Sequence, residues 1–199
     1  MKLKLAAASL ILFIVFVGTA FSGEIKGTVT TQGIRSPEGI VVYLDAVPGK
    51  TFTAPKEHAV MDQKKMTFIP HILPVLQGTV VDFLNSDSVG HNVYWPSVSG
   101  NKKLAHNLGT WPQGEKKSFT FQDIGSVPLL CNVHPEMSAY IVVTPTPYFA
   151  ATNAQGEYAI KDVPPGKYTL KTWSEQGKPV EQPVEVPGAL TTVNLTVHR

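Results

Sequence analysis

Residues 79–93 read TVVDFLNSDSVGHNV, and this stretch gives the clearest indication of the fold. Its first six residues are rich in β-branched and aromatic types and predict a strand, whereas the Asn, Ser, Asp and Gly residues that follow predict a turn. The same alternation of short apolar runs with turn residues extends over residues 57–144. We expect strands at 59–62, 66–68, 73–75, 79–84, 92–95, 118–121, 127–131 and 139–143. Short strands at this spacing favour a small Greek-key sandwich.

The composition of the whole chain agrees with strands rather than helices. It contains 16 Gly and 16 Pro, and short runs of Val, Ile, Thr, Tyr and Phe lie between them. No segment shows a sustained helical period with capping residues at both ends. We therefore predict an all-β protein.

The first 22 residues have the pattern of a secretory signal peptide. Two lysines in the opening MKLK precede an uncharged run from Leu5 to Gly23, with small residues near a cleavage point at Ala20 or Ser22. The run is short for a membrane span, and no second apolar run follows. We expect an exported protein, periplasmic or secreted, with no stable membrane span after cleavage.

The charge balance makes nucleic acid an improbable partner. Removing Lys2 and Lys4 would equalise the 17 Lys and Arg with the 15 Asp and Glu, and no basic patch is evident. Exported chains commonly use cysteines in disulfide pairs, but Cys131 is a single cysteine. A bond to a metal would account for this thiol, although a buried structural thiol is the usual alternative.

Residues 131–137 read CNVHPEM and supply three chemically unusual side chains at intervals of three. A thiolate, an imidazole and a thioether, with the second imidazole of His91 from an upstream loop, suit copper in both of its oxidation states. Zinc is a weaker alternative, because a thioether is a poor zinc ligand. The expected metal ligands are His91, Cys131, His134 and Met137.

Four motifs occur in order: MTFIP at 66–70, QGTVVDFLN at 77–85, GHNV at 90–93, and CNVHPEM. Together they resemble the cupredoxin family of type 1 blue copper proteins, and we assign residues 57–144 to such a domain. The short Cys-x-x-His-Pro-x-Met loop is amicyanin-like rather than plastocyanin-like. The resemblance implies a Greek-key β-sandwich that holds one type 1 copper ion.

The resemblance also implies roles for residues of the ligand loops. His134 is expected to be the exposed ligand through which electrons leave, and Asn92 to hydrogen-bond across to the cysteine loop. Pro135 has no N–H to donate to a sulfur atom, and fewer donors to the thiolate of Cys131 would keep the reduction potential low. A nearby Glu136 carboxylate would favour Cu(II) in the same way.

For some residues near these motifs, the sequence leaves two roles open. Tyr94, Trp95 and Pro96 could form an apolar docking surface beside the metal end, or Trp95 could pack in the core. His71 is expected at the edge of a strand and His106 in a long loop. Whether either histidine binds a metal is left open.

The tail resembles a carboxypeptidase regulatory-like domain, a small transthyretin-like β-sandwich. The resemblance rests on TNAQGEY at 152–158 and VPPGKYTL at 163–170. That family begins with a Gly-x-Val strand and a Val-rich strand, which residues 24–46 supply and the tail lacks. We therefore expect one domain made of residues 24–55 and 146–199, with the cupredoxin domain inserted. In the alternative, the N-terminal strands extend the cupredoxin sheet.

The function that best fits these features is transfer of single electrons between redox partners, for example a cytochrome and a dehydrogenase or oxidase. A copper storage or delivery protein, and a cell-envelope interaction module that carries a copper domain, are the alternatives. No general base, nucleophile or open metal position is evident. An enzyme is not expected.

Overall fold

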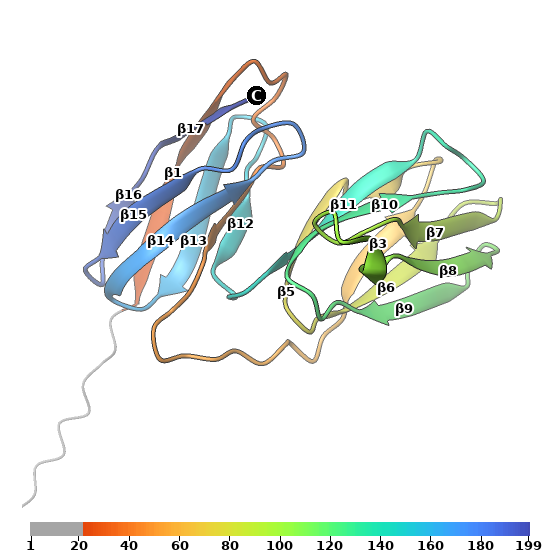
Figure 1. Cartoon of the computed structure of the whole chain (residues 1–199), viewed down its shortest axis with the longest axis horizontal. Helices are drawn as coiled ribbons and strands as arrows, with labels where there is room; N and C mark the ends of the chain where they lie inside the picture. The colour runs from red at the N-terminus through yellow and green to blue at the C-terminus, as the bar shows by residue number, and fades with distance from the viewer. Residues whose placement is uncertain (1–21) are drawn as a thin grey trace, which may run out of the picture.

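The computed structural model describes residues 22–199, which form two β-sandwiches lying side by side (Figure 1). The expected signal peptide lies outside these residues except for Ser22. Within the described part, no helix has the length and apolar character needed to cross a membrane. Apart from one short 3-10 helix, the regular elements are strands, so the all-β prediction is confirmed.

The middle sandwich, residues 59–144, packs a five-stranded sheet, β5-β11-β10-β7-β8, against a four-stranded sheet, β4-β3-β6-β9. Its elements are β3 (Ala59–Gln63), β4 (Phe68–Ile69), β5 (Ile72–Leu76), β6 (Val80–Asn85), β7 (His91–Trp95), η1 (Lys102–Leu104), β8 (His106–Trp111), β9 (Lys116–Thr120), β10 (Gly125–Leu130) and β11 (Ser138–Thr144). Met61, Phe83, Val127 and Ile141 are fully buried between the sheets. Their burial supplies the hydrophobic free energy that holds the two sheets together.

The pairing of β10 with β7 brings two loops to one end of the five-stranded sheet. Leu130, the last residue of β10, pairs with Tyr94 of β7, and β11 then returns antiparallel to β10. The start of β7 and the end of β10 therefore lie next to each other. His91 begins β7, and Cys131 directly follows β10.

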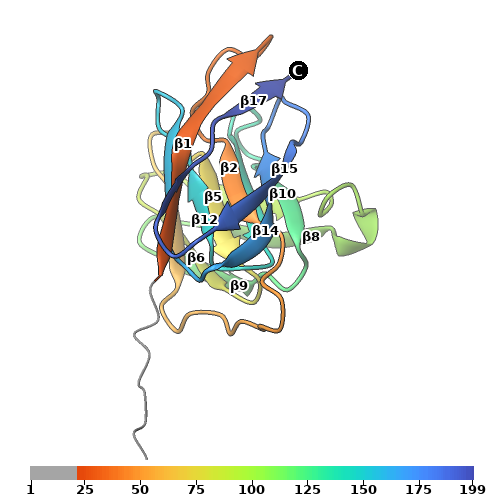
Figure 2. The ribbon, with the colours of Figure 1, turned by 90° about the vertical axis from the view of Figure 1, so that its left-hand side faces the viewer.

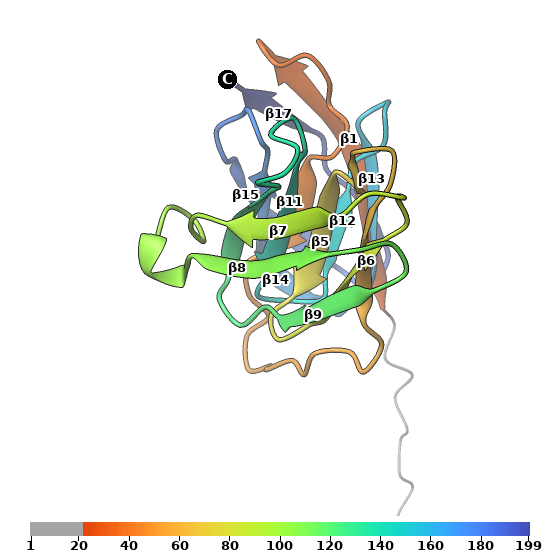
Figure 3. The ribbon, with the colours of Figure 1, turned by 90° about the vertical axis from the view of Figure 1, so that its right-hand side faces the viewer.

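Strand β8 was not expected from the sequence, which suggested a long loop around His106. It forms the outer edge of the five-stranded sheet, next to β7 (Figure 3). Its last residue, Trp111, is the one buried residue of this strand. An edge strand with so little buried surface has no alternating apolar pattern to reveal it. Gly109 has a φ of 83°, and the Asn107 side chain accepts a hydrogen bond from its N–H, so the strand is also irregular.

The strands outside the middle sandwich form two further sheets, which we call the terminal sandwich. One sheet has the order β12-β2-β14-β15, and in the other β1 pairs with β13 on one side and with β16 and β17 on the other. Figure 2 shows β17 running beside β1. The strands are β1 (Gly23–Gln32), β2 (Val41–Leu44), β12 (Phe149–Ala151), β13 (Glu157–Val163), β14 (Gly166–Trp173), β15 (Glu181–Val186), β16 (Leu190–Thr192) and β17 (Leu195–His198).

The strand pairing bears on how the domains are arranged in the sequence. Among residues 22–199, β1 and β2 pair with strands that follow the middle sandwich, although they precede it in the chain. Ile25, Val42, Ile160 and Leu170 from both ends share one buried core. On these pairings we propose that residues 24–55 and 146–199 form one domain, into which the middle sandwich is inserted.

The connection that follows the middle sandwich, at residues 144–146, is hydrogen-bonded to both sandwiches. The Thr144 hydroxyl donates to the Val75 carbonyl at 3.0 Å, and the Thr146 hydroxyl donates to the Leu44 carbonyl at 2.8 Å. Both threonines are buried. The connection is therefore anchored to one strand of each sandwich.

Candidate metal centre

Three of the four expected ligands converge at the end of the middle sandwich where β7 begins and β10 ends. One ligand atom from each of His91, Cys131 and His134 lies within 4.8 Å of the others. The two Nδ1 atoms of His91 and His134 face each other at 3.0 Å. Two nitrogens that bind one ion at about 2.0 Å are separated by about 3 Å, so this geometry fits a shared metal.

The candidate ligands differ in their exposure to solvent. The side chain of His91 is 0% exposed, and Cys131 and Met137 are almost as deeply buried. His134 is partly exposed. Met137 lies in the same short loop, and its N–H donates to the His134 carbonyl at 3.0 Å, which keeps the loop tight. A buried cysteine sulfur beside two imidazoles is a group of candidate ligands that suits copper.

Asn92 connects the two ligand-bearing loops. Its backbone N–H donates to the Cys131 sulfur at 3.4 Å, and its side-chain oxygen accepts from the Asn132 N–H at 3.3 Å. Its amide nitrogen donates to the Asn107 oxygen at 2.8 Å. These three contacts hold the β7 loop, the cysteine loop and the edge strand β8 together.

Asp87 is a further residue of the site, and the sequence reasoning missed it. Its carboxylate faces Nε2 of His91 at 2.9 Å and accepts hydrogen bonds from the backbone N–H groups of Lys65 and Met66. Burial acts to raise the pKa of Asp87, but the hydrogen bonds from Met66, Lys65 and His91 hold it below the ordinary value. With Nε2 bonded to this carboxylate, His91 presents Nδ1 to the site.

The remaining predicted residues lie in varied places. Pro135 and Glu136 are exposed in the ligand loop. Tyr94 is partly buried and Pro96 is exposed. Trp95 is 2% exposed, and its indole N–H donates to the Leu104 carbonyl at 3.0 Å. The docking role suggested for Trp95 is therefore wrong, because its ring packs in the core.

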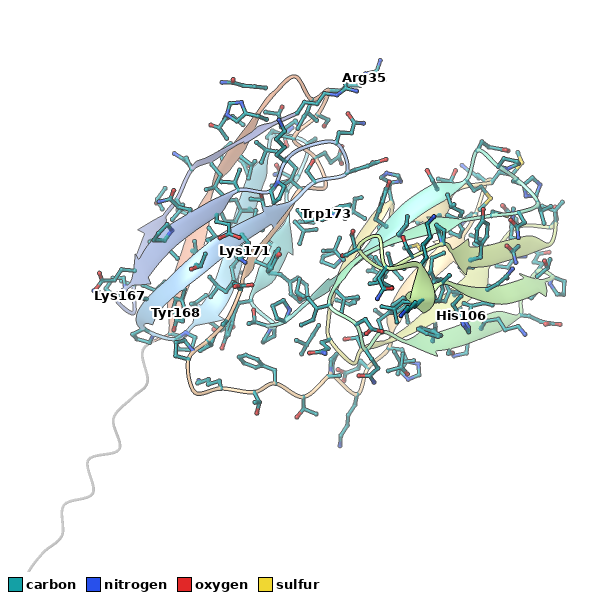
Figure 4. The ribbon with its side chains drawn as sticks, in the orientation of Figure 1. Arg35, His106, Lys167, Tyr168, Lys171 and Trp173 are labelled. Carbon is teal, nitrogen blue, oxygen red and sulfur yellow. The ribbon has the colours of Figure 1, made fainter. Side chains whose placement is uncertain are left out.

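The two histidines left open lie outside the cluster of candidate ligands. His106 stacks against the rings of Trp95 and Phe119, with ring centroids 5.2 and 4.9 Å away. Figure 4 labels His106 in the middle sandwich. His71 contacts Ser138 and Glu175 at the junction of the two sandwiches. Among the residues that the structure describes, neither belongs to a group of three candidate ligands.

Comparison with known proteins shows what the middle sandwich is similar to. Residues 56–144 match the family model described as copper binding proteins, plastocyanin/azurin family. A reduced Cu(I) amicyanin variant shares 27% identity over 45% of this chain and 84% of its own length, with a TM-score of 0.41. A purple cupredoxin from Nitrosopumilus maritimus shares 23% identity over 43% of this chain and 99% of its own, with a TM-score of 0.39. No curated protein matches the chain.

Residues 56–144 are thus similar to the copper-binding proteins of the plastocyanin/azurin family, as the motifs had indicated. Copper is the cofactor of that family, and the prediction of a copper cofactor is confirmed. The comparisons do not identify the terminal sandwich. Its resemblance to carboxypeptidase regulatory-like domains stays a prediction.

Proposed function

We propose that this protein carries single electrons by means of one type 1 copper ion held by His91, Cys131, His134 and Met137. The observation that carries the proposal is the convergence of the first three ligands within 4.8 Å, in a domain of a copper-binding family. Copper bound there would supply a reversible one-electron couple. The protein would supply a fixed set of ligands.

The surroundings of the ligands favour fast electron transfer, because they resist rearrangement. Asn92 ties the cysteine loop to β7, and Asp87 holds the ring of His91. Cys131 is the last residue before the loop turns, so it is held directly by the end of β10. Ligands that cannot move much between the two oxidation states lower the reorganisation required for each transfer.

His134 is the ligand that we assign to exchange of electrons with partners. It is partly exposed, whereas His91 is buried and faces inward to Asp87. The proposed partners are exported redox proteins of the cytochrome, dehydrogenase or oxidase class, and the proposed location is the periplasm or the exterior of the cell. We assign no catalytic residue.

The proposal is tested by adding Cu(II) to the purified protein and recording visible and electron-paramagnetic spectra. We expect an intense thiolate-to-copper absorption band that disappears on reduction and returns on oxidation. Cys131→Ala should abolish the band, while Asn132→Ala, an exposed neighbour in the same loop, should retain it. Tight binding of Cu(I) with a colourless Cu(II) state would instead favour copper storage or delivery.

A further inference from the structure

His71 lies at the junction of the two sandwiches, in the turn between β4 and β5. Its Nε2 atom is 2.9 Å from the Glu175 carboxylate, which belongs to the loop after β14 in the terminal sandwich. Its Nδ1 atom is 3.1 Å from the carbonyl oxygen of Ser138, the first residue of β11. One imidazole therefore contacts both sandwiches.

Both neighbours of the His71 imidazole are hydrogen-bond acceptors. A backbone carbonyl accepts a hydrogen bond, and so does a carboxylate, so both nitrogens of His71 face acceptors. The imidazolium form is the one that could donate to both at once. In that form the contact with Glu175 would be a charge-assisted hydrogen bond.

His71 also pairs with β11 through its main chain. The N–H of Tyr140 donates to the His71 carbonyl at 2.8 Å, and the two rings meet edge-on with centroids 6.2 Å apart. Ser138 directly follows Met137, the last residue of the ligand loop. His71 thus holds the chain at the point where it leaves the metal site, while Asn92 holds the loop near Cys131.

The terminal sandwich surrounds this contact with further packing. Tyr140 lies against Trp173, the last residue of β14, with ring centroids 5.1 Å apart. Trp173 lies on the side of the terminal sandwich that faces the middle one (Figure 4). A cavity of about 160 Å³ beside His71 is lined by charged side chains of the terminal sandwich, namely Arg35, Glu38 and Glu175. Arg35 and Glu38 thus share this cavity with His71, whereas Glu175 and the ring of Tyr140 contact it directly.

We infer that His71 is a positioning residue, through which Glu175 of the terminal sandwich fixes the exit of the Cys131–Met137 loop and so the placement of Met137. The inference rests on the proposed copper function, which makes Met137 a ligand. The terminal sandwich does not contact the candidate metal ligands. Through His71 it would nevertheless affect where Met137 lies. The loop is held at its start by its own domain and at its end by the neighbouring one.

The inference is tested with Glu175→Gln and His71→Gln in the full-length protein. Glu181→Gln is the matched control, because it removes the same charge from the terminal sandwich at an ion pair with Lys171. We expect copper release to a chelator to be about threefold faster in both test variants, on the scale of a half-exposed ion pair. The midpoint potential should shift in the same two variants. The control should match the wild type in both measurements.

Two measurements on the copper-free protein separate this inference from the proposed function. Nitrogen-15 spectra of the wild type should show a doubly protonated His71 ring, and this signature should be lost in Glu175→Gln. Exchange of the Met137 N–H should be faster in Glu175→Gln than in Glu181→Gln. A wild type without the thiolate-to-copper band overturns the proposed function, even if the copper-free results hold. A wild type with that band, and a Glu175→Gln variant identical to the control, overturns the positioning role alone.

Discussion

Asp87 determines how the buried candidate ligand His91 faces the other candidate ligands. The carboxylate occupies Nε2 of the ring, so only Nδ1 is free to face His134 and Cys131. The N–H groups of Lys65 and Met66 hold the carboxylate in turn. The orientation of His91 therefore depends on the hairpin between β3 and β4, more than twenty residues away along the chain.

Replacing this carboxylate should weaken copper binding while the protein stays folded. An amide in Asp87→Asn lacks the charge that supports His91, and it cannot accept as many hydrogen bonds. We expect copper affinity to fall by about 10- to 100-fold, the usual effect of losing the group that orients a metal-binding histidine. Competition with a chelator of known affinity measures the change. Asp123→Asn, which alters an exposed carboxylate of the same sandwich, should bind copper normally.

Asn92 affects stability more than ligand orientation. Asn92→Ala leaves the backbone N–H to the Cys131 sulfur in place, but it removes the side-chain partners of Asn132 and Asn107. Unfolding by urea should show a loss of about 1–2 kcal/mol, because two part-buried hydrogen bonds are lost. Loss of copper colour without any loss of stability would contradict this assignment.

The candidate ligands could be recognised from the sequence, whereas Asp87, which hydrogen-bonds to His91, could not. Cys131, His134 and Met137 stand in one short loop, and their chemistry is unusual enough to be recognised together. Asp87 follows a strand among Ser and Asn, where an acidic residue usually marks a turn. Its contact with Met66 depends on how two loops meet in space. No local pattern could have revealed it.

At the scale of elements, β6 and β9 are joined by a cluster of polar side chains on the outer face of their sheet. Asp82 of β6 accepts hydrogen bonds from Lys116 and Ser118 of β9, and His58 contacts it from before β3. The bonds from Lys116 and Ser118 hold the pKa of Asp82 far below its usual range. This cluster therefore stabilises the pairing of β6 with β9 while Asp82 is charged.

Asp82→Asn should reduce the free energy of unfolding by about 2 kcal/mol at neutral pH, because hydrogen bonds to a charged group are lost. The contribution of a depressed carboxyl is complete above the unfolded value of about 4, and it declines as the pH falls below that value. The wild type and the variant should therefore converge in stability as the pH is lowered from 4. Urea unfolding across this range measures the gap, and a gap that stayed constant would contradict the assignment.

Whether a strand could be predicted from the sequence depends on how many of its side chains are buried. Strands such as β6 and β11 were predicted because they present apolar residues to a core, and they are close to the expected residues 79–84 and 139–143. Strand β12 was missed, as β8 was, because each lies at a sheet edge and has few buried side chains. The five-stranded sheet nevertheless depends on β8, since it covers β7 beside the metal site.

At the scale of the whole molecule, the two connections between the sandwiches differ in how strongly they are held. The return connection is fixed by the buried Thr144 and Thr146, whereas Lys50 and Lys56 in the outgoing segment are exposed. Phe52 lies between the two lysines and packs edge-on against Tyr148 at 5.8 Å. A protease should therefore cleave the outgoing segment around residues 50–56 faster than the return connection at residues 144–146.

Cleavage of the outgoing segment tests the proposed insertion directly. Brief trypsin treatment should cut after Lys50 or Lys56 and give a short N-terminal fragment that contains β1 and β2. If these strands belong to the terminal sandwich, the fragment should stay bound in native gel filtration and separate only in denaturant, because its strands pair with β13, β14 and β17. The copper colour of the nicked protein should persist, since none of the ligands lies in that fragment. Release of the fragment under native conditions would show that the terminal sandwich does not need residues 24–55, and the insertion would be wrong.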